Sequence, residues 1–264
     1  MMQSYHLIRA EITKLIHIER SYWVSLLADQ LFFILSFLIV TGVFDLVTDG
    51  NFDRWARLSA LIGYLTWRVA GGCMVETAVS VADDAQFGTL EQVWLSGESI
   101  SLILFARSCT FILYYTLRVI LMALIIMPLL RIPVIIVPGS IVIYLLTVGS
   151  AFGLAFAITG LHLITKNVES ITMPLATALL FFSGALSSLE GIPILYGISR
   201  FLPLSIGIDL LRKMLVEGTG FWQIAVSRDF YGLVVNTAVY LIIGLFTLKW
   251  AGDKARQAGT LGHY

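Results

Sequence analysis

Charged residues are scarce in this chain: Asp, Glu, Lys and Arg make up 13% of its 264 residues, against 58% hydrophobic residues. A soluble fold of this length cannot bury so much apolar surface, which favours an integral membrane protein. The formal net charge is zero, with 17 basic and 17 acidic side chains. The chain therefore has no basic field that would attract nucleic acid.

Cysteines, histidine clusters and nucleotide-binding motifs are also lacking. The two cysteines, Cys73 and Cys109, lie in apolar runs and predict small buried side chains rather than a disulfide framework. The four histidines lack metal-ligand spacing, and nothing groups Ser, His and Asp as in a hydrolase. We therefore expect no metal site and no catalytic site. No Gly-x-x-x-x-Gly-Lys-Ser/Thr sequence occurs, so the chain cannot cradle a nucleotide in a P-loop.

Long apolar runs are what the sequence has in abundance. Five of them are long enough to cross a hydrocarbon core of roughly 30 Å as helices, near residues 23–44, 58–81, 100–130, 134–163 and 231–250. A sixth run, at residues 171–186, is short for a crossing. The run at 134–163 is rich in small residues, which let helices approach closely. These runs predict an all-α integral membrane protein with about six transmembrane helices.

Two further segments have their own patterns. In residues 5–22, Ile8, Ile12 and Leu15 recur at helical spacing with the basic residues mostly elsewhere, which predicts an amphipathic helix in the membrane interface. Residues 187–228 are apolar but broken by Pro and Gly. Such backbone is tolerated at membrane depth only where protein or water covers it. We predict two short re-entrant helices there, before the last span.

A dense polar block at residues 83–98 separates the second apolar run from the third. Thr89 precedes Gln92 at the spacing of a capping box, and Gly97 suits the end of a helix. The block therefore predicts a helix of about two turns. Three apolar residues at i, i+3 and i+7 form a stripe suited to a partner surface: Phe87, Leu90 and Trp94.

The sequence Gly-Thr-Leu-Glu at residues 88–91 resembles the Glu-x-x-Gly-Thr-Leu-Glu signature of ATP-binding cassette (ABC) type-2 permeases. Asp84 stands where that family commonly has Glu, and Gly97 where it commonly has Pro. A second similarity follows the fifth run: a Pro-rich apolar segment, a Pro before a small-residue helix, and Arg212 with Gly218 downstream. By topology the resemblance covers nearly the whole chain.

The resemblance implies that residues 1–264 form a single permease domain. This domain would lie in the plasma or inner membrane, with both termini in the cytosol. Residues 1–22 would be a connecting helix, 83–98 a cytosolic coupling helix, and 187–228 an external segment. Two permeases, identical or related, would join two cytosolic ATPase subunits that hold ATP and Mg, with no cofactor on this chain. The residues implied to contact the ATPase are Phe87, Gly88, Thr89, Leu90, Glu91 and Trp94.

The function implied by the resemblance is ATP-driven export of a hydrophobic or amphipathic substrate, such as a drug or antibiotic, a lipid or a peptide. The competing function is an ATP-independent, ion-coupled secondary transporter or channel, in which intramembrane charges form an ion path. Basic residues are nearly balanced between the segments predicted inside and outside, so the orientation rests on the resemblance and on the basic termini.

Four charged residues fall inside the apolar runs: Asp29, Arg68, Glu76 and Arg118. Each would cost several kcal/mol facing lipid, so we expect them to face a bundle, a cavity or each other. Our hypothesis is that Asp29 pairs with Arg68 or Arg118 and braces the fold. The alternative is that one of the four contacts substrate in the translocation path.

Glu76 lies seven and eight residues before Asp83 and Asp84, which places all three on one helical face. That face either relays motion from residues 83–98 or is a solvated helix end. Five phenylalanines on the first and fifth runs are candidates to line an apolar substrate path, with lipid-facing packing as the alternative: Phe32, Phe33, Phe37, Phe181 and Phe182.

Overall fold

The computed structural model describes residues 2–50, 52–86, 100–165 and 169–257, and all regular structure in these ranges is helical. The prediction of an all-α membrane protein is confirmed. The helices are α1 (Met2–Ser21), α2 (Trp23–Val47), α3 (Arg54–Gln86), α5 (Ile100–Leu129), α6 (Ser140–Thr165), α7 (Glu169–Phe182), α8 (Pro193–Ser199), α9 (Ser205–Leu215), α10 (Phe221–Ala225) and α11 (Arg228–Gln257).

Five of the described helices, α2, α3, α5, α6 and α11, are long and apolar enough to cross a membrane. The sixth predicted span, α7, has 14 residues. At a rise of about 1.5 Å per residue it falls short of a hydrocarbon core of roughly 30 Å. The chain turns after α7 at Gly184, whose φ is 74°, a value that glycine adopts without strain.

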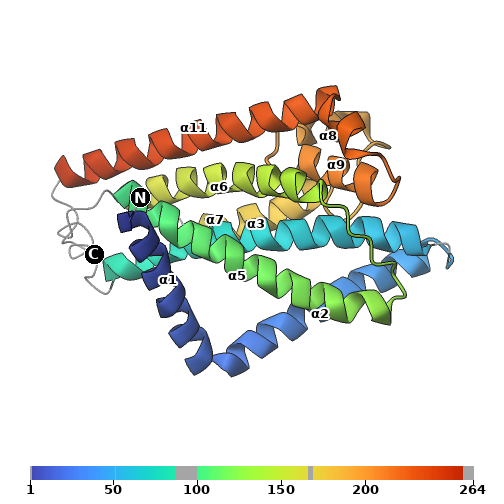
Figure 1. Cartoon of the computed structure of the whole chain (residues 1–264), viewed down its shortest axis with the longest axis horizontal. Coiled ribbons are helices and arrows are strands. Elements are labelled where there is room, and N and C mark those ends of the chain that lie inside the picture. The colour runs from blue at the N-terminus through green and yellow to red at the C-terminus, as the bar shows by residue number, and fades with distance from the viewer. Residues whose placement is uncertain (1, 51, 87–99, 166–168, 258–264) are drawn as a thin grey trace.

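The two ends of the molecule differ in what they hold (Figure 1). The start of α1 and the last turn of α11 lie at one end, together with the last turn of α3 and the first turn of α5, and we name this the proximal end (Figure 1). The short helices α8 and α9 lie at the opposite end with the turn between α2 and α3, and we name this the distal end. Helix α1 lies at the proximal end and crosses the direction of the long helices steeply (Figure 1).

Helices α6 and α11 run side by side through close glycine contacts (Figure 1). A Cβ atom at Gly153 of α6 would lie 2.2 Å from the carbonyl carbon of Tyr240, and one at Gly244 of α11 would lie 2.1 Å from the carbonyl oxygen of Gly153. The predicted close approach through small residues is therefore confirmed. The predicted start of this span at residue 134 was wrong: residues 133–137 have no regular structure, because Pro138 disfavours helix in the residue before it.

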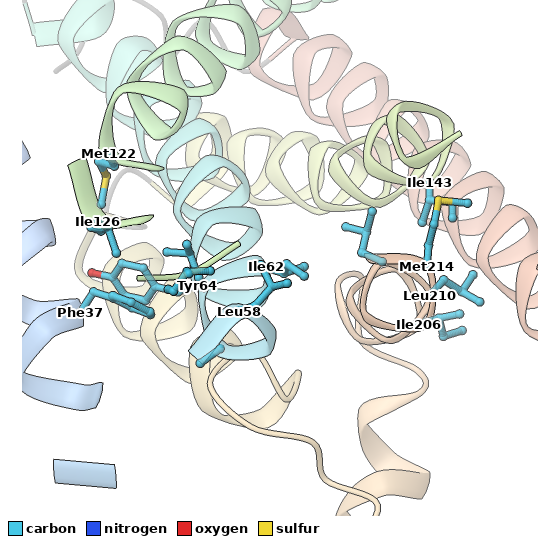
Figure 2. Packing of buried hydrophobic residues seen from close by; sticks show 14 of the residues in the cluster. Phe37, Leu58, Ile62, Tyr64, Met122, Ile126, Ile143, Ile206, Leu210 and Met214 are labelled. Atoms are coloured by element: carbon cyan, nitrogen blue, oxygen red, sulfur yellow. The ribbon is translucent and has the colours of Figure 1, made fainter. Parts of the chain in front are cut away.

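The largest core cluster of the described residues lies in the distal half and joins α2, α3, α5, α6, α9, α10 and α11 (Figure 2). Between membrane spans, van der Waals packing rather than transfer out of water holds such side chains together, and it fixes α9 against the spans. Its labelled members are Phe37 on α2, Leu58, Ile62 and Tyr64 on α3, Met122 and Ile126 on α5, Ile143 on α6, and Ile206, Leu210 and Met214 on α9.

The segment predicted to hold two short helices contains α8 and α9, and α10 follows as a third that the sequence did not predict. Helix α9 is the buried one, packed on α6, α11 and α3. Its contact with α6 requires a glycine, since a Cβ at Gly207 would lie 1.8 Å from Oγ1 of Thr147. The distal helices are therefore part of the packed body of the subunit.

Candidate functional site

Asp29 on α2 lies between two arginines. Its Oδ2 accepts a hydrogen bond from Nη2 of Arg68 on α3 at 2.8 Å and another from Nη2 of Arg118 on α5. The sequence predicted that Asp29 pairs with Arg68 or Arg118. In the structure it pairs with both. One carboxylate thus ties together three membrane-spanning helices.

Arg118 is held by further polar groups on α2 and α5. Its Nε donates to Oε1 of Gln30 at 3.1 Å, while Nε2 of Gln30 donates to the backbone oxygen of Arg118 at 2.8 Å. Its Nη1 donates to the Tyr114 hydroxyl at 3.0 Å, and its Nη2 to the backbone oxygen of Leu26 at 3.3 Å. The planar guanidinium is therefore fixed on both edges. The sequence alone did not lead us to predict a role for Gln30. A polar glutamine beside Asp29 in an apolar run could have indicated one.

Arg68 is held by aromatic rings as well as by Asp29. Its guanidinium carbon lies 3.6 Å from the ring centre of Phe33 and 4.9 Å from that of Tyr115. Such cation–π contacts stabilise a desolvated arginine. The Tyr115 hydroxyl donates to Oε1 of Glu76 at 3.1 Å, which joins the fourth predicted charge to the group.

We name these four residues, Asp29, Arg68, Glu76 and Arg118, the ion cluster. It contains two cations and two carboxyl groups, so its charges offset one another inside the apolar runs. The two arginine side chains are each 10% exposed and Asp29 is 37% exposed, so removing Asp29 leaves two buried cations uncompensated, which is destabilising. The arrangement is suited to bracing α2, α3 and α5 as one unit.

A second junction forms at the proximal end around Arg107 on α5, which is 4% exposed. Its Nη1 donates to Oδ2 of Asp84 at 2.8 Å and to the backbone oxygen of Ser80 at 3.2 Å, both on α3. Its Nε donates to Oε1 of Glu11 on α1 at 3.4 Å. One cation thus fastens α1, α3 and α5 where α3 leads into residues 87–99 and α5 leaves them. The sequence alone did not predict that Arg107 joins these three helices.

The predicted coupling helix lies outside the described residues. Helix α3 continues through Asp83 and Asp84 to Gln86, five residues beyond the predicted end of the span at residue 81. Asp83 is exposed while Asp84 binds Arg107. The residues predicted to contact the ATPase, all of them outside the described ranges, are Phe87, Gly88, Thr89, Leu90, Glu91 and Trp94.

The five phenylalanines proposed for a substrate path do not share one environment. Phe37 is 0% exposed and packs against Tyr64 in the core, so it cannot line a path on the subunit surface. Phe33 lies beneath the Arg68 guanidinium and belongs to the surroundings of the ion cluster. The three that are exposed are Phe32 on α2 and Phe181 and Phe182 on α7.

The distal end holds a third set of charges. Arg212 on α9 donates to the backbone oxygens of Ser59 at 3.2 Å and Ala185 at 3.0 Å, and its Nη1 lies 3.8 Å from Oδ1 of Asp209. Burial raises the pKa of Asp209 to about 6, although Arg212 opposes the shift. Gly218, which follows α9, has a φ of 73°, a conformation that favours glycine.

Among the described residues, no group of three or more His, Cys, Asp or Glu side chains is arranged to hold a metal ion. The family model described as ABC-2 type transporter matches residues 2–216, which include the ion cluster, the Arg107 junction and the segment between α3 and α5. Comparison with curated proteins found no match.

Proposed function

The chain belongs to the ABC-2 type transporter family, and from that premise we propose that it is the permease subunit of an ATP-driven exporter of hydrophobic or amphipathic molecules. The family makes it a multi-pass membrane subunit that associates with an ABC ATPase. Because the sequence has no P-loop, the proposal assigns ATP and Mg to the ATPase and no catalytic step to this chain.

The observation that carries the proposal is the way the proximal end is fastened around residues 87–99. Arg107 of α5 holds α3 and α1, so a partner that pushes on this segment acts on three helices at once. We place ATPase docking on this segment, with buried apolar anchors at Leu90 and Trp94. The other docking residues in the proposal are Phe87, Gly88, Thr89 and Glu91.

In the proposed cycle, closure of two ATPase subunits on ATP moves α3 and α5. Arg68 and Arg118 on these helices hold the same carboxylate, Asp29, so α2 follows them. The permease pair then shifts between inward-facing and outward-facing states. The extent of the shift is limited by the difference in ATPase affinity for the two states.

For the substrate we propose an apolar surface on α2 and α7. Phe32, Phe181 and Phe182 are exposed there, and aromatic rings offer large apolar contact area to a lipid-like or drug-like molecule. A second permease, either a copy of this chain or a relative, would enclose this surface from the other side.

The experiment that tests the proposal is affinity purification of the tagged chain from native membranes in mild detergent. Wild type is compared with the double variant Trp94→Ala/Glu91→Arg. The matched control, Trp222→Ala/Glu217→Arg, makes the same changes at two exposed distal residues. We expect an ATPase subunit to co-purify with wild type and with the control, and to be lost from the Trp94 variant.

Two outcomes contradict the proposal. If wild type brings down no ATPase subunit, an ion-coupled carrier that works without ATP replaces the exporter. If the Trp94 variant keeps the ATPase, or if the distal control loses it equally, docking is not at residues 87–99. Thermal unfolding of each purified variant shows whether the permease itself is intact.

A further inference from the structure

The acidic and basic side chains of α1 lie on different faces of the helix. Glu11 is partly buried and bound by Arg107, and Glu19 is partly buried near the Tyr114 hydroxyl. The acidic side chains of α1 therefore face the protein. The basic side chains on the described part of the helix are all exposed: Arg9, Lys14 and Arg20. None of the three forms an ion pair with another described residue.

In the part of the chain that the structure describes, the distal end shows no comparable basic face. Arg57 pairs with Asp45, and Arg200 and Lys213 both pair with Asp229. Its remaining exposed arginines come from separate segments, and exposed acidic residues of the same end accompany them. The exposed distal arginines are Arg54, Arg131 and Arg228, and the exposed distal acids are Asp49, Asp53, Glu190 and Glu217.

The basic face of α1 lies where lipid headgroups are expected. Arg20 is three residues before Trp23, the first residue of the span α2, which corresponds to about 4.5 Å of helix. Tyr22 and Trp23 are exposed, as in the aromatic belts at membrane interfaces. Because α1 crosses the long helices steeply (Figure 1), its outward face extends along the membrane surface rather than away from it.

The apolar residues on α1 support a lipid partner over a protein partner. Ile16 and Ile18 are exposed among the basic residues, and a helix that combines basic and apolar exposed residues is typical of a membrane-surface helix. We propose that the outward face of α1, with Arg9, Lys14 and Arg20, binds the phosphate groups of anionic phospholipids in the leaflet that α2 enters at Trp23. This contact holds α1 at the membrane surface and does not depend on an ATPase.

The test uses the full chain, purified alone, in nanodiscs of phosphatidylcholine and phosphatidylglycerol. After mild delipidation, native mass spectrometry counts the lipids retained. Each basic residue near an anionic surface strengthens binding several-fold, so we expect Arg9→Gln/Lys14→Gln/Arg20→Gln to lower the preference for phosphatidylglycerol by at least about tenfold. The matched control replaces Arg54, Arg131 and Arg228 with Gln and should retain the preference.

Three further measurements keep the proposal open to refutation. The charge-conserving variant Arg9→Lys/Arg20→Lys should keep the lipid preference, since lysine binds phosphate as a point charge. Raised salt should weaken the preference in wild type, because exposed charges are screened. If the triple variant retains phosphatidylglycerol as wild type does, the proposal is wrong. A separate affinity purification from native membranes then shows whether the variant has lost an ATPase, in which case the face binds protein. Equal lipid loss from the distal control also overturns it.

Discussion

The ion cluster around Asp29 and the Asp209–Arg212 pair on α9 both set carboxylates against arginines, yet they differ in how well their polar atoms are satisfied. In the ion cluster, Asp29 accepts from two guanidiniums, and Arg118 has four partner groups. At the distal pair, Oδ2 of Asp209 and Nη1 of Arg212 are buried without a hydrogen-bond partner among the described residues. A satisfied buried network rigidifies a fold, whereas an unsatisfied one is a source of instability.

The difference follows from the helices that supply the partners. The ion cluster collects side chains from α2, α3 and α5, so Asp29 on α2 accepts from arginines on two other helices. Asp209 and Arg212 lie three residues apart on one helix, and their closest approach is 3.8 Å. Other nitrogens of Arg212 donate hydrogen bonds to backbone oxygens of neighbouring segments. We therefore expect the ion cluster to act as a brace, while Asp209 remains a group that can take up a proton.

The largest expected effect comes from breaking the brace. Asp29→Asn leaves two buried guanidiniums without their shared carboxylate, and we expect the free energy of unfolding to fall by about 3 kcal/mol. Unfolding in detergent measures this loss. Asp45→Asn, which breaks the more exposed pair with Arg57, is the control. Equal losses for the two variants would show that Asp29 is not a brace.

The next largest effect is expected at Arg107. Here one cation is shared by two carboxylates, whereas in the ion cluster one carboxylate is shared by two cations. Arg107→Gln removes the cation that Glu11 and Asp84 share, and we expect a loss of about 2 kcal/mol, since the repulsion between the two carboxylates is no longer offset. Adding Glu11→Gln relieves the repulsion. The double variant should then be less destabilised than the sum of the single ones, with a coupling of about 1 kcal/mol. Strict additivity in this double-mutant cycle would contradict the junction.

At the distal pair, we expect a substitution to raise the free energy of unfolding instead of lowering it. Burial raises the pKa of Asp209 from 3.8 to about 6, so the folded protein binds this proton more tightly than the unfolded chain does. Stability therefore falls as pH rises from about 4 to 6 and stays lower above that window. Asp209→Asn should raise the free energy of unfolding at neutral pH by about 1–2 kcal/mol.

Thermal unfolding measured from pH 4 to pH 8 checks the Asp209 prediction. The Asn variant should lose the part of the pH dependence that lies between about pH 4 and 6. A wild type and a variant with the same pH profile would show that Asp209 titrates at its ordinary value.

The smallest effect is expected for the exposed ion pair at the turn between α2 and α3. Arg57 meets Asp45 at 3.2 Å, with both side chains partly open to solvent. Such pairs contribute about 0–1 kcal/mol, so Arg57→Gln should leave the unfolding midpoint nearly unchanged. A loss as large as that of Asp29→Asn would mean that ion pairing at the surface of this protein matters as much as it does inside.

Much of the fold was predictable from local pattern. The structure places α2, α3, α5 and α11 on the predicted apolar runs, because a membrane span must satisfy its backbone hydrogen bonds internally and is visible in sequence as a long apolar stretch. Boundaries were less predictable. Helix α3 continues to Gln86, since its last turns are stabilised by Arg107 from another helix rather than by an apolar sequence.

The candidate site was predictable only in outline. That Asp29 needs an arginine follows from the cost of a bare charge among apolar residues. That it binds both Arg68 and Arg118 depends on where three helices bring their side chains. The same limit explains Phe37, which looked like a surface aromatic and is buried against Tyr64.

By itself, the sequence determined the helical membrane class, the approximate spans and the need for the intramembrane charges to be compensated. These features follow from length, apolar content and solvation cost, which are properties of each segment alone. The tertiary structure decided the partners: both arginines for Asp29, Arg107 for Glu11 and Asp84, and the inward turn of the α1 acids. Partner choice depends on distances between residues far apart in the chain, which only the packing of helices sets.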